Sequence, residues 1–202
     1  MEKETMVRLP LPNTEGLLSL EATLRARRSR RSFSRQALTL IEVAQLLWAA
    51  QGITSRNGLR TAPSAGALYP LELFLEVGRV EQLAEGVYRY APEDHALSEV
   101  SRAARRSELV IAGYGQGCIG QGAVNIVVAA VYGRTARKYG ERRAVRYVQL
   151  EAGHAAQNVS LQAVALGLGT VVVGAFDDDL VREALLLADD VSPLAIMPVG
   201  RE

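Results

Sequence analysis

The stretch Val124-Asn-Ile-Val-Val-Ala-Ala-Val-Tyr132 is an almost unbroken apolar run that is rich in β-branched side chains. Strands that are buried on both faces carry such runs, whereas strands with one face in water alternate apolar and polar residues. The run therefore predicts the central strand of a sheet, and the rest of the chain has to cover both faces of that sheet.

Helices and strands are predicted on both sides of this run. The longest helix is expected over Arg142–Leu168, where Gly167 and Gly169 end it. Thr39 and Glu42 form a capping box at the start of another helix. We expect further helices over Ser19–Arg27, Thr39–Gln51, Ser101–Ala112 and Asp177–Leu187, and further strands over Leu71–Val77, Val87–Tyr90, Ala96–Val100, Thr170–Val173 and Leu194–Val199. This order has no strict βαβ rhythm, which favours an α+β fold with a mixed sheet and packed helices.

The composition is that of one ordinary globular domain. Of the 202 residues, 49% are hydrophobic and 22% are charged, which excludes disorder as the main state. We place an extended lead-in, punctuated by Pro and Gly, at residues 1–18 and a single domain at residues 19–202. The net charge of +1 argues against a dedicated nucleic-acid binder.

Cysteine and histidine are scarce in this chain. The one cysteine, Cys118, has no partner for an intrachain disulfide, and two histidines do not complete a Cys/His zinc site, so we expect no metal. Residues 1–8 mix acids and bases without an apolar core, so we expect no signal peptide. Together these features predict a cytoplasmic protein.

One uncharged stretch is long enough to cross a bilayer, because no residue from Ala152 to Phe176 carries a formal charge. Its first half, however, contains polar side chains from His154 to Gln162, and each of them would need a partner inside lipid. The stretch therefore predicts a buried helix followed by a buried strand, and no membrane association.

Neither of two common glycine-rich phosphate-binding motifs is supported by the sequence. Gly115-Gln-Gly-Cys-Ile-Gly120 spells G-x-G-x-x-G, but a predicted helix precedes it and the predicted strand follows it, which is the wrong context for a dinucleotide-binding turn. A P-loop lysine motif is absent, since the only lysines are Lys3 and Lys138.

Six arginines and no acid lie between Ala22 and Arg35. Arg28 and Arg31 are three positions apart, so on a helix end they would share one side. Guanidinium forks match phosphate oxygens, which favours a phosphorylated ligand. A solvated helix end, arginines attracted by the helix dipole and a nucleic-acid patch are the alternatives, and the single aromatic of the cluster, Phe33, disfavours the last of these.

Several motifs, in order along the chain, resemble the nitroreductase family, and in detail the branch that contains the SagB-type dehydrogenases, which oxidise azoline rings in peptides. The resemblance covers about residues 19–201. The motifs that carry it are Arg27–Phe33, Leu46–Gly52, Ala62–Pro70, Lys138–Gly140, Glu151–Asn158, Gly174–Phe176 and Pro198–Gly200. The resemblance implies a nitroreductase-like fold with a largely antiparallel sheet flanked by helices, noncovalently bound FMN, and a homodimer with two sites at its interface.

The resemblance also implies which residues bind FMN. The first motif is expected to grip the phosphate and ribityl chain, with Arg30 solvated at a variable position. The loop in the Ala62–Pro70 motif is expected to reach the flavin from the partner subunit, and the Gly174 turn is expected to meet the flavin near N5. The implied cofactor-binding residues are Arg27, Arg28, Ser29, Arg31, Pro63, Ser64, Ala65, Gly66, Ala67, Gly174, Ala175 and, after the last strand, Arg201.

Lys138 and Tyr139 match the Lys–Tyr pair that is assigned as the base in the resembling dehydrogenases. A lysine acts as a base only in its neutral form, which the nearby cations Arg134, Arg137, Arg142 and Arg143 would favour. The alternative is an exposed lysine at a helix start. For His154 we favour a hydrogen-bonded core residue over a catalyst.

The functional hypothesis is an FMN-dependent oxidoreductase with ping-pong hydride transfer through flavin N5, acting on a small molecule or peptide. Two alternatives stay open: an NAD(P)H-dependent nitro or quinone reductase, and a flavin-binding protein without turnover. We expect a homodimer in which a small-residue face of the long helix allows close approach. That face consists of Ala152, Gly153, Ala156, Ala163 and Gly167.

Overall fold

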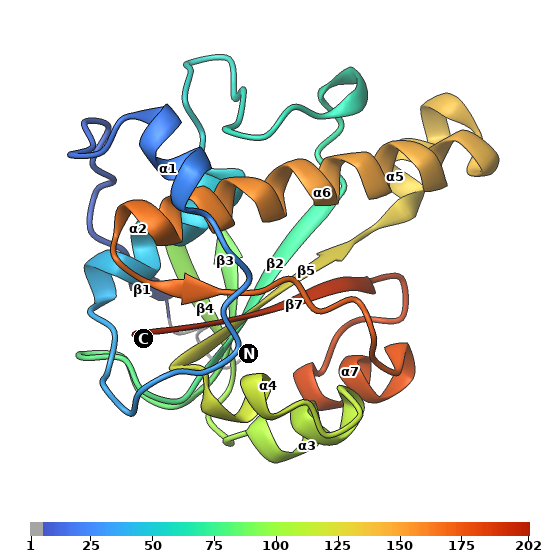
Figure 1. Ribbon diagram of the computed structural model, residues 1–202. Helices are drawn as coiled ribbons and strands as arrows, with labels where there is room; N and C mark the ends of the chain where they lie inside the picture. The colour runs from blue at the N-terminus through green and yellow to red at the C-terminus, as the bar shows by residue number, and fades with distance from the viewer. Residues whose placement is uncertain (1–5) are drawn as a thin grey trace.

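The computed structural model describes residues 6–202 as an α+β fold built on one antiparallel sheet of seven strands (Figure 1). The order of the strands is β1-β4-β3-β2-β5-β7-β6. The strands are β1 Met6–Arg8, β2 Leu71–Val77, β3 Gly86–Ala91, β4 Ala96–Ser101, β5 Val124–Ala130, β6 Gly169–Thr170 and β7 Ser192–Gly200. The helices are α1 Leu20–Ala26, α2 Leu40–Gln51, the 3₁₀ turn η1 Ala65–Ala67, α3 Arg106–Ala112, α4 Gly117–Gln121, α5 Tyr132–Tyr139, α6 Glu141–Ala165 and α7 Asp178–Leu185.

The predicted central strand is confirmed as β5, which pairs with β2 on one side and with β7 on the other. All of its residues are buried. Because successive side chains of a strand point to opposite faces, Ile126 and Val128 enter one hydrophobic core and Val127 and Ala129 enter the other. An unbroken apolar run is thus what a strand between two helical layers requires.

The two helical layers lie on opposite faces of the sheet (Figure 1). On one face α2 packs against α6, and both contribute to the larger core together with β2 and β5. On the other face α3 packs against α7, and their apolar side chains form the second core with β5 and β7. The longest helix, α6, runs across one face of the sheet and contacts β2, β5, β6 and β7.

Side-chain caps fix the start of three helices where the sequence predicts them. The Ser19 hydroxyl accepts a hydrogen bond from the Ala22 N–H at the start of α1, and Asp177 does the same for the Leu180 N–H at the start of α7. Thr39 and Glu42 form the predicted capping box of α2. Each of these contacts satisfies an N–H group that the helix itself leaves unpaired.

Four expectations about the elements differ from the structure. The predicted lead-in contains the edge strand β1, paired with β4; its residues 1–5 lie outside the described part of the chain. Ser101 ends β4, so the predicted Ser101–Ala112 helix begins only at Arg106. The helix α5 was not predicted, because it has few apolar residues to show a period. The predicted Thr170–Val173 strand is shorter, since β6 ends at Thr170 and Val173 makes only an isolated bridge to Ile196.

The uncharged stretch from Ala152 to Phe176 forms the second half of α6 and the buried β6, as predicted. Within residues 6–202 we find no helix whose length and hydropathy would let it cross a bilayer. The small-residue face of α6 is not free for a partner, because Ala152, Ala156 and Ala163 are buried in the core of the chain itself. Only Gly153 and Gly167 of the expected face are exposed.

A buried ion pair ties α3 to the sheet. Glu76, in the middle of β2, is only 1% exposed, and its Oε2 accepts hydrogen bonds from Arg106 Nη2 at 2.9 Å and Asn125 Nδ2 at 2.8 Å. Arg106 also donates to the carbonyls of Gly122 and Ala123. Removing one partner of such a pair leaves a buried charge without compensation.

We therefore expect Arg106→Ala to lower the free energy of unfolding by about 3–5 kcal/mol. The matched control is Arg105→Ala, which removes a more exposed pair with Glu108 and should cost less than about 1 kcal/mol. Urea unfolding of both variants, followed by circular dichroism, measures the difference. Equal losses in the two variants would contradict the role assigned to Arg106.

Candidate functional site

The predicted arginine motif does not form a helix end. The helix α1 stops at Ala26, and the chain then runs extended beside β6, where Ser29 bridges Thr170 and the Arg30 N–H donates to the Thr170 carbonyl at 2.9 Å. The argument from helical spacing between Arg28 and Arg31 is therefore wrong. Their exposure to solvent results instead from an extended segment lying on the edge of the fold.

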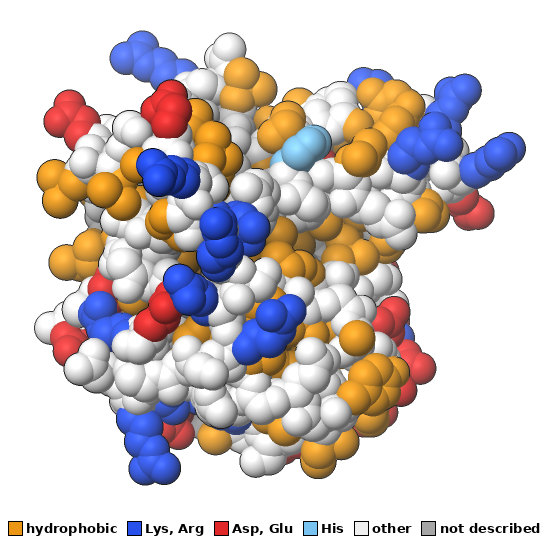
Figure 2. All heavy atoms as spheres, in the orientation of Figure 1, with side chains coloured by type: hydrophobic (Ala, Val, Ile, Leu, Met, Phe, Trp, Pro, Cys, Tyr) orange, Lys and Arg blue, Asp and Glu red, His pale blue; other side chains and the backbone are white. Residues whose placement is uncertain are grey.

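The arginines of this segment differ in what they already bind. Arg28, Ser29 and Arg31 are exposed, and Arg28 Nη1 donates to the carbonyls of Arg25 and Arg27 at the end of α1. Arg30 is half-exposed and pairs with Glu202 at 3.0 Å, so it is not simply solvated as we expected. Figure 2 shows Lys and Arg side chains gathered over the segment that leaves α1 in Figure 1. This segment offers guanidinium groups to an anion in solvent.

The Gly174 turn lies on the same side of the fold as the arginine segment. It follows β6 after a few residues, and β6 is the strand that the arginine segment contacts. Gly174 and Ala175 are exposed, and a Cβ added at Gly174 would meet open space. Among residues 6–202 no hydrogen bond from either N–H is found, whereas the Ala175 carbonyl accepts one from Gln116. Two backbone donors are therefore available next to an arginine-rich strip.

Arg201 is engaged inside the fold. Its Nη2 binds both carboxylate oxygens of Glu42, at 2.9 and 3.0 Å, and its Nε donates to the Ala37 carbonyl. Glu42 is also the acid of the α2 capping box, so Arg201 ties the end of the chain to the start of that helix. This contact gives Arg201 a structural task, and its predicted role at a phosphate stays a prediction.

The other predicted residues meet at the opposite end of α6. Gly66, in η1, has a φ of 66°, a left-handed conformation that favours glycine. A Cβ at this position would lie 2.7 Å from the Tyr139 hydroxyl and 2.9 Å from Lys138 Nζ. The lysine–tyrosine pair and the loop Pro63–Ala67, which lie far apart in sequence, therefore form one cluster.

The surroundings of Lys138 differ from the expectation. Lys138 is exposed in the last turn of α5, rather than at a helix start, and Nζ lies 5.4 Å from the centre of the Tyr139 ring. Of the four expected cations, Arg134 is held elsewhere, because it donates to Glu72 and to the Tyr69 carbonyl. The Tyr139 ring packs edge-on against Tyr147 of α6, which fixes its position beside the lysine.

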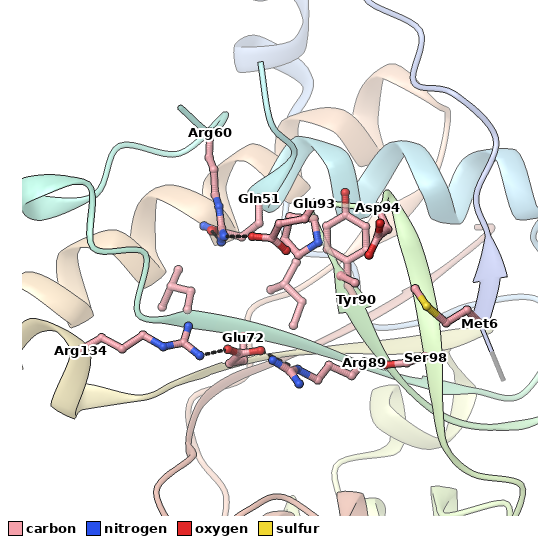
Figure 3. A pocket seen from close by; sticks show the side chains of 14 residues that line it. Met6, Gln51, Arg60, Glu72, Arg89, Tyr90, Glu93, Asp94, Ser98 and Arg134 are labelled. Carbon is pink, nitrogen blue, oxygen red and sulfur yellow. Dashed lines mark hydrogen bonds and ion pairs between the residues drawn. The ribbon is translucent and has the colours of Figure 1, made fainter. Parts of the chain in front are cut away.

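A polar pocket of about 410 Å³, which we did not predict, lies between the sheet and the 52–70 loop, with Glu72 and Arg60 among its lining residues (Figure 3). On one wall Glu72 binds Arg89 at 2.7 Å and also binds Arg134. On the other wall Arg60 donates to Gln51 and Glu93. The signal in the sequence was the two acids within the apolar strand Leu71–Val77, since a buried acid in a strand requires a cationic partner.

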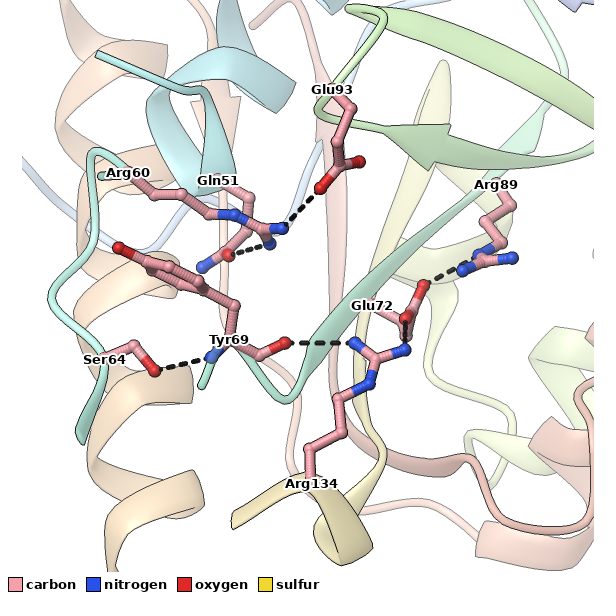
Figure 4. A network of polar contacts seen from close by, with 8 residues as sticks. All are labelled: Gln51, Arg60, Ser64, Tyr69, Glu72, Arg89, Glu93 and Arg134. Atoms are coloured by element: carbon pink, nitrogen blue, oxygen red, sulfur yellow. Dashed lines mark hydrogen bonds and ion pairs between the residues drawn. The ribbon is translucent and has the colours of Figure 1, made fainter. Parts of the chain in front are cut away.

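A continuous network joins this pocket to the loop (Figure 4). Arg60 stacks over the Tyr69 ring at 4.5 Å, and the Tyr69 carbonyl accepts from Arg134. The Tyr69 N–H donates to Ser64 Oγ at 2.9 Å. Ser64 is the residue of the network that belongs to the predicted cofactor loop, so the network fixes that loop against the sheet.

Two residues of the Glu151–Asn158 motif have unexpected environments. Glu151 is 2% exposed, and burial raises the pKa of its carboxyl to about 7, against smaller opposing effects of a Ser64 hydrogen bond and Arg60. His154 is exposed on the outer side of α6, so the expectation that it is a core residue is wrong. Among residues 6–202 no cluster of His, Cys, Asp and Glu side chains is suited to a metal ion.

The helix α6 separates the two groups of predicted residues. Glu151 contacts Ser64 of the loop, while Val164 lines a small cavity with Arg28 and Arg30. Thirteen residues separate these two positions of α6, which corresponds to about 20 Å along the helix axis. One chain thus presents an arginine-rich strip near one end of α6 and a lysine–tyrosine cluster near the other.

The antiparallel α+β fold, with its arginine strip and its lysine–tyrosine cluster near the two ends of α6, can now be compared with known proteins. The chain belongs to the nitroreductase family of oxidoreductases, because it matches the profile of that family over residues 24–201. A Methanocaldococcus jannaschii protein with a nitroreductase name, MJ1384, is 45% identical over 194 residues, which are 96% of each chain.

Further proteins are similar in structure or in sequence. A crystal structure of an Anabaena variabilis protein with a nitroreductase name has a TM-score of 0.86 at 30% identity. The similar region covers 98% of this chain and 42% of the Anabaena chain. The microcin B17-processing protein McbC of Escherichia coli is 30% identical over 147 residues, 70% of this chain and 54% of McbC. The E. coli microcin synthetase McbBCD complex with truncated pro-MccB17 has a TM-score of 0.76 at 25% identity, covering 100% of this chain and 79% of the matched chain.

The contact at Gly66 predicts a local effect of Gly66→Ala. Both Gly66→Ala and the control Gly58→Ala, whose φ is 76°, should lose about 1–2 kcal/mol of stability, because alanine is strained in this conformation. Only at Gly66 would the new methyl group displace the lysine–tyrosine pair, since nothing lies within 4 Å of a Cβ at Gly58.

The measurement uses the two lysines of the chain as reporters. Reductive methylation with ¹³C-formaldehyde labels Lys3, Lys138 and the N-terminal amine, and the Lys138 methyl signal should shift in Gly66→Ala and stay in place in Gly58→Ala. A Lys138 signal that is the same in both variants would show that Gly66 and Lys138 are not in contact.

Proposed function

We propose that this protein is an FMN-dependent oxidoreductase of the SagB type that works as a homodimer. The observation that carries the proposal is the meeting of Lys138, Tyr139 and Gly66 at one point of the fold. The likeness to McbC, a protein named for peptide processing, favours a peptide or a small molecule with an azoline ring as the substrate.

The residues present fit FMN. Arg27, Arg28 and Arg31 with the Ser29 hydroxyl supply donors that match a single terminal phosphate. The exposed N–H groups of the Gly174 turn supply donors for a planar, oxygen- and nitrogen-rich ring. FAD would need a second binding region, and the G-x-G-x-x-G sequence lies after α3 and before β5, which is not a dinucleotide-binding context.

The two ends of α6 favour a site that is shared between two chains. Tyr147, which contacts Tyr139 of the cluster, and Val164, which lines a cavity with Arg28 and Arg30, are 17 residues apart on α6. This corresponds to about 25 Å along the helix axis, so one small cofactor does not reach both groups within a single chain. In a homodimer with twofold symmetry, the strip of one chain lies opposite the cluster of the other, which gives two equivalent sites. The exposed side of α6, with Val145 and Leu150, is available for this contact.

In this scheme the residues of the chain have separate tasks. Bound FMN would supply the two-electron, hydride-accepting chemistry of a ping-pong cycle, held by the arginine strip and the Pro63–Ala67 loop. Lys138, in its neutral form, removes the proton that the substrate ring loses, and Tyr139 orients the lysine. The arginines and the Pro63–Ala67 loop hold the cofactor and take no proton.

The second candidate is an NAD(P)H-dependent nitro or quinone reductase. The observation that favours it is the exposure of Lys138 in α5. A lysine that is open to water lacks the burial that would favour its neutral, basic form, so this exposure argues against a role as a base. Nicotinamide gives up its hydride without the loss of a ring proton, so this reaction needs no base. The two candidates therefore differ in their dependence on Lys138.

The arginine strip gives the first prediction of this function. Arg28→Ala and Arg31→Ala should each raise the FMN dissociation constant about ten- to a hundredfold, because a charge-assisted hydrogen bond contributes about 1.5–3 kcal/mol. The matched control is Arg30→Ala, whose side chain pairs with Glu202 and should change the affinity little. Flavin fluorescence titration measures all three, and chromatography of heat-released flavin identifies FMN or FAD. Equal affinities in the three variants, or bound FAD, would contradict the assignment.

Lys138 gives the second prediction. Lys138→Ala should keep FMN bound and reducible by dithionite, but slow the oxidation of a thiazoline-containing peptide about a hundred- to ten-thousand-fold, because a general base is lost. Stopped-flow absorbance of the flavin measures both properties. Unchanged NAD(P)H-driven turnover in this variant, together with no azoline oxidation in the unaltered protein, would favour the reductase.

Mixing two impaired variants tests whether the site is shared, at an FMN concentration below the dissociation constant of Arg28→Ala, where neither variant alone turns over. If Arg28 and Lys138 of different chains form one site, a heterodimer of Arg28→Ala and Lys138→Ala has one intact site and one doubly altered site. After random exchange of subunits, about a quarter of the unaltered activity should return. If both residues act within one chain, mixing restores nothing.

A further inference from the structure

A second pocket, of about 550 Å³, lies on the side of the sheet that α3 and α7 cover. Three parts of the chain line it: the strands β2 to β4, the first turns of α5, and the connection from α7 to β7. Its volume is in the range of small-molecule sites. None of the residues used in the proposed function belongs to its lining, so this pocket, which we call the α5–α7 pocket, has no task in that scheme.

The floor of the α5–α7 pocket is apolar. Phe74 of β2 and Val191, which precedes β7, are buried members of the second core of the fold. Val100 of β4 and Val131, at the start of α5, are half-buried and pack against the same core. A ligand that covers this floor removes apolar surface from water, which favours the binding of an apolar group.

One wall of the pocket carries guanidinium groups with donors to spare. Glu72 lies between Arg89 and Arg134 and binds both, so one carboxylate serves two cations (Figure 4). Arg89 makes this contact through Nε, and its side chain is half-exposed. Arg137, one turn after Arg134 on α5, is exposed and makes no hydrogen bond or ion pair within residues 6–202. The wall therefore has more cationic donors than acceptors.

The acids of the α5–α7 pocket do not cancel this excess. Glu99 is already paired with Arg102 at 2.7 Å, and Asp190 is exposed in the connection from α7 to β7. With Arg102 counted beside its partner, four arginines face three acids, which leaves an excess of one positive charge. A ligand with a single carboxylate would balance this charge and would give Arg137 the partner that it lacks.

The conformation of Leu186 is a second, independent sign of a ligand. Leu186 ends α7 with a φ of 54° and a ψ of 43°, a left-handed conformation that glycine adopts freely and leucine does not. Its large apolar side chain is nevertheless 51% exposed and lines the pocket. A strained residue that keeps an apolar side chain in water weakens the chain on its own, whereas it strengthens the binding of an apolar ligand that covers it.

We propose that the α5–α7 pocket binds a small amphipathic monocarboxylate. The apolar body of the ligand lies between Phe74 and Leu186. Its carboxylate accepts hydrogen bonds from Arg137 and from the terminal nitrogens of Arg89. Arg137 directly precedes Lys138, but successive residues of a helix point about 100° apart, so the ligand and the lysine–tyrosine cluster lie on different sides of α5. The site is therefore additional to the proposed function and does not depend on it.

The probe is phenylpropanoate, and isothermal titration calorimetry measures its affinity. Two related compounds separate the contributions of the floor and of the wall: phenylpropanamide keeps the apolar body without the charge, and acetate keeps the carboxylate without the body. Each compound lacks one of the two sets of contacts, so both should bind at least about tenfold more weakly. Equal affinities for the acid and either compound, or no saturable binding of phenylpropanoate, would overturn the proposal.

Substitution of arginines tests where the carboxylate binds. Arg137→Gln should weaken the binding of phenylpropanoate about ten- to a hundredfold, because a charge-assisted hydrogen bond is lost. The matched control is Arg56→Gln, which removes an exposed arginine of the 52–70 loop and should leave the affinity unchanged. Arg28→Gln tests the arginine strip as a rival location. If this variant weakens binding as much as Arg137→Gln does, the anion binds at the strip and the proposal is wrong.

Leu186→Gly separates binding from folding. Glycine relieves the left-handed strain at the end of α7, so the unfolding temperature should stay the same or rise. The affinity for phenylpropanoate should nevertheless fall about tenfold, because the ligand loses an apolar contact. An unchanged affinity in this variant would contradict the proposal at any unfolding temperature. None of these titrations uses FMN, so a failure of the proposed cofactor would be seen separately in the fluorescence titration.

Discussion

The antiparallel pairing of β5 with β2 and β7 is the contact on which the remainder of the fold depends. Because every side chain of β5 is buried, both helical layers have to be in place before the strand is shielded from water. The α2–α6 layer and the α3–α7 layer are therefore parts of one unit, although their cores are separate. The buried pair of Glu76 and Arg106 adds a polar connection between the sheet and one of these layers.

The position of the candidate site follows from α6, which crosses one face of that sheet. At its start the helix receives α5 and the Lys138 cluster, and at its end it leads into β6 and the arginine strip. Neither group has the complete set of donors that the proposed chemistry needs. In the proposed function these two groups are the halves of one site, and the fold keeps them apart within one chain.

Much of this could be predicted from the sequence where a local rule applies. The apolar run at Val124, the capping box at Thr39 and the helix that begins near Asp177 depend on near neighbours, and the structure confirms them. The environments of Arg28, His154 and Glu151 could not be predicted in this way, because burial and exposure there depend on segments that are distant in sequence. The contact between Gly66 and Lys138 is of the same kind, since only the folding of α5 onto α6 brings these residues together. The resemblance to the nitroreductase family named both groups of residues, and the structure adds where each of them lies.

The length of α6 has a consequence for how such a chain can change over evolutionary time. Removing one residue between Glu151 and Val164 would turn everything after it by about 100° and shorten the helix by about 1.5 Å. The arginine strip lies against β6, which follows α6, so its position relative to the Pro63–Ala67 loop would change. No residue of either group would have been altered. Insertions and deletions are therefore expected to collect in surface turns such as residues 102–105, where they change no such alignment, while the spacing within α6 stays fixed.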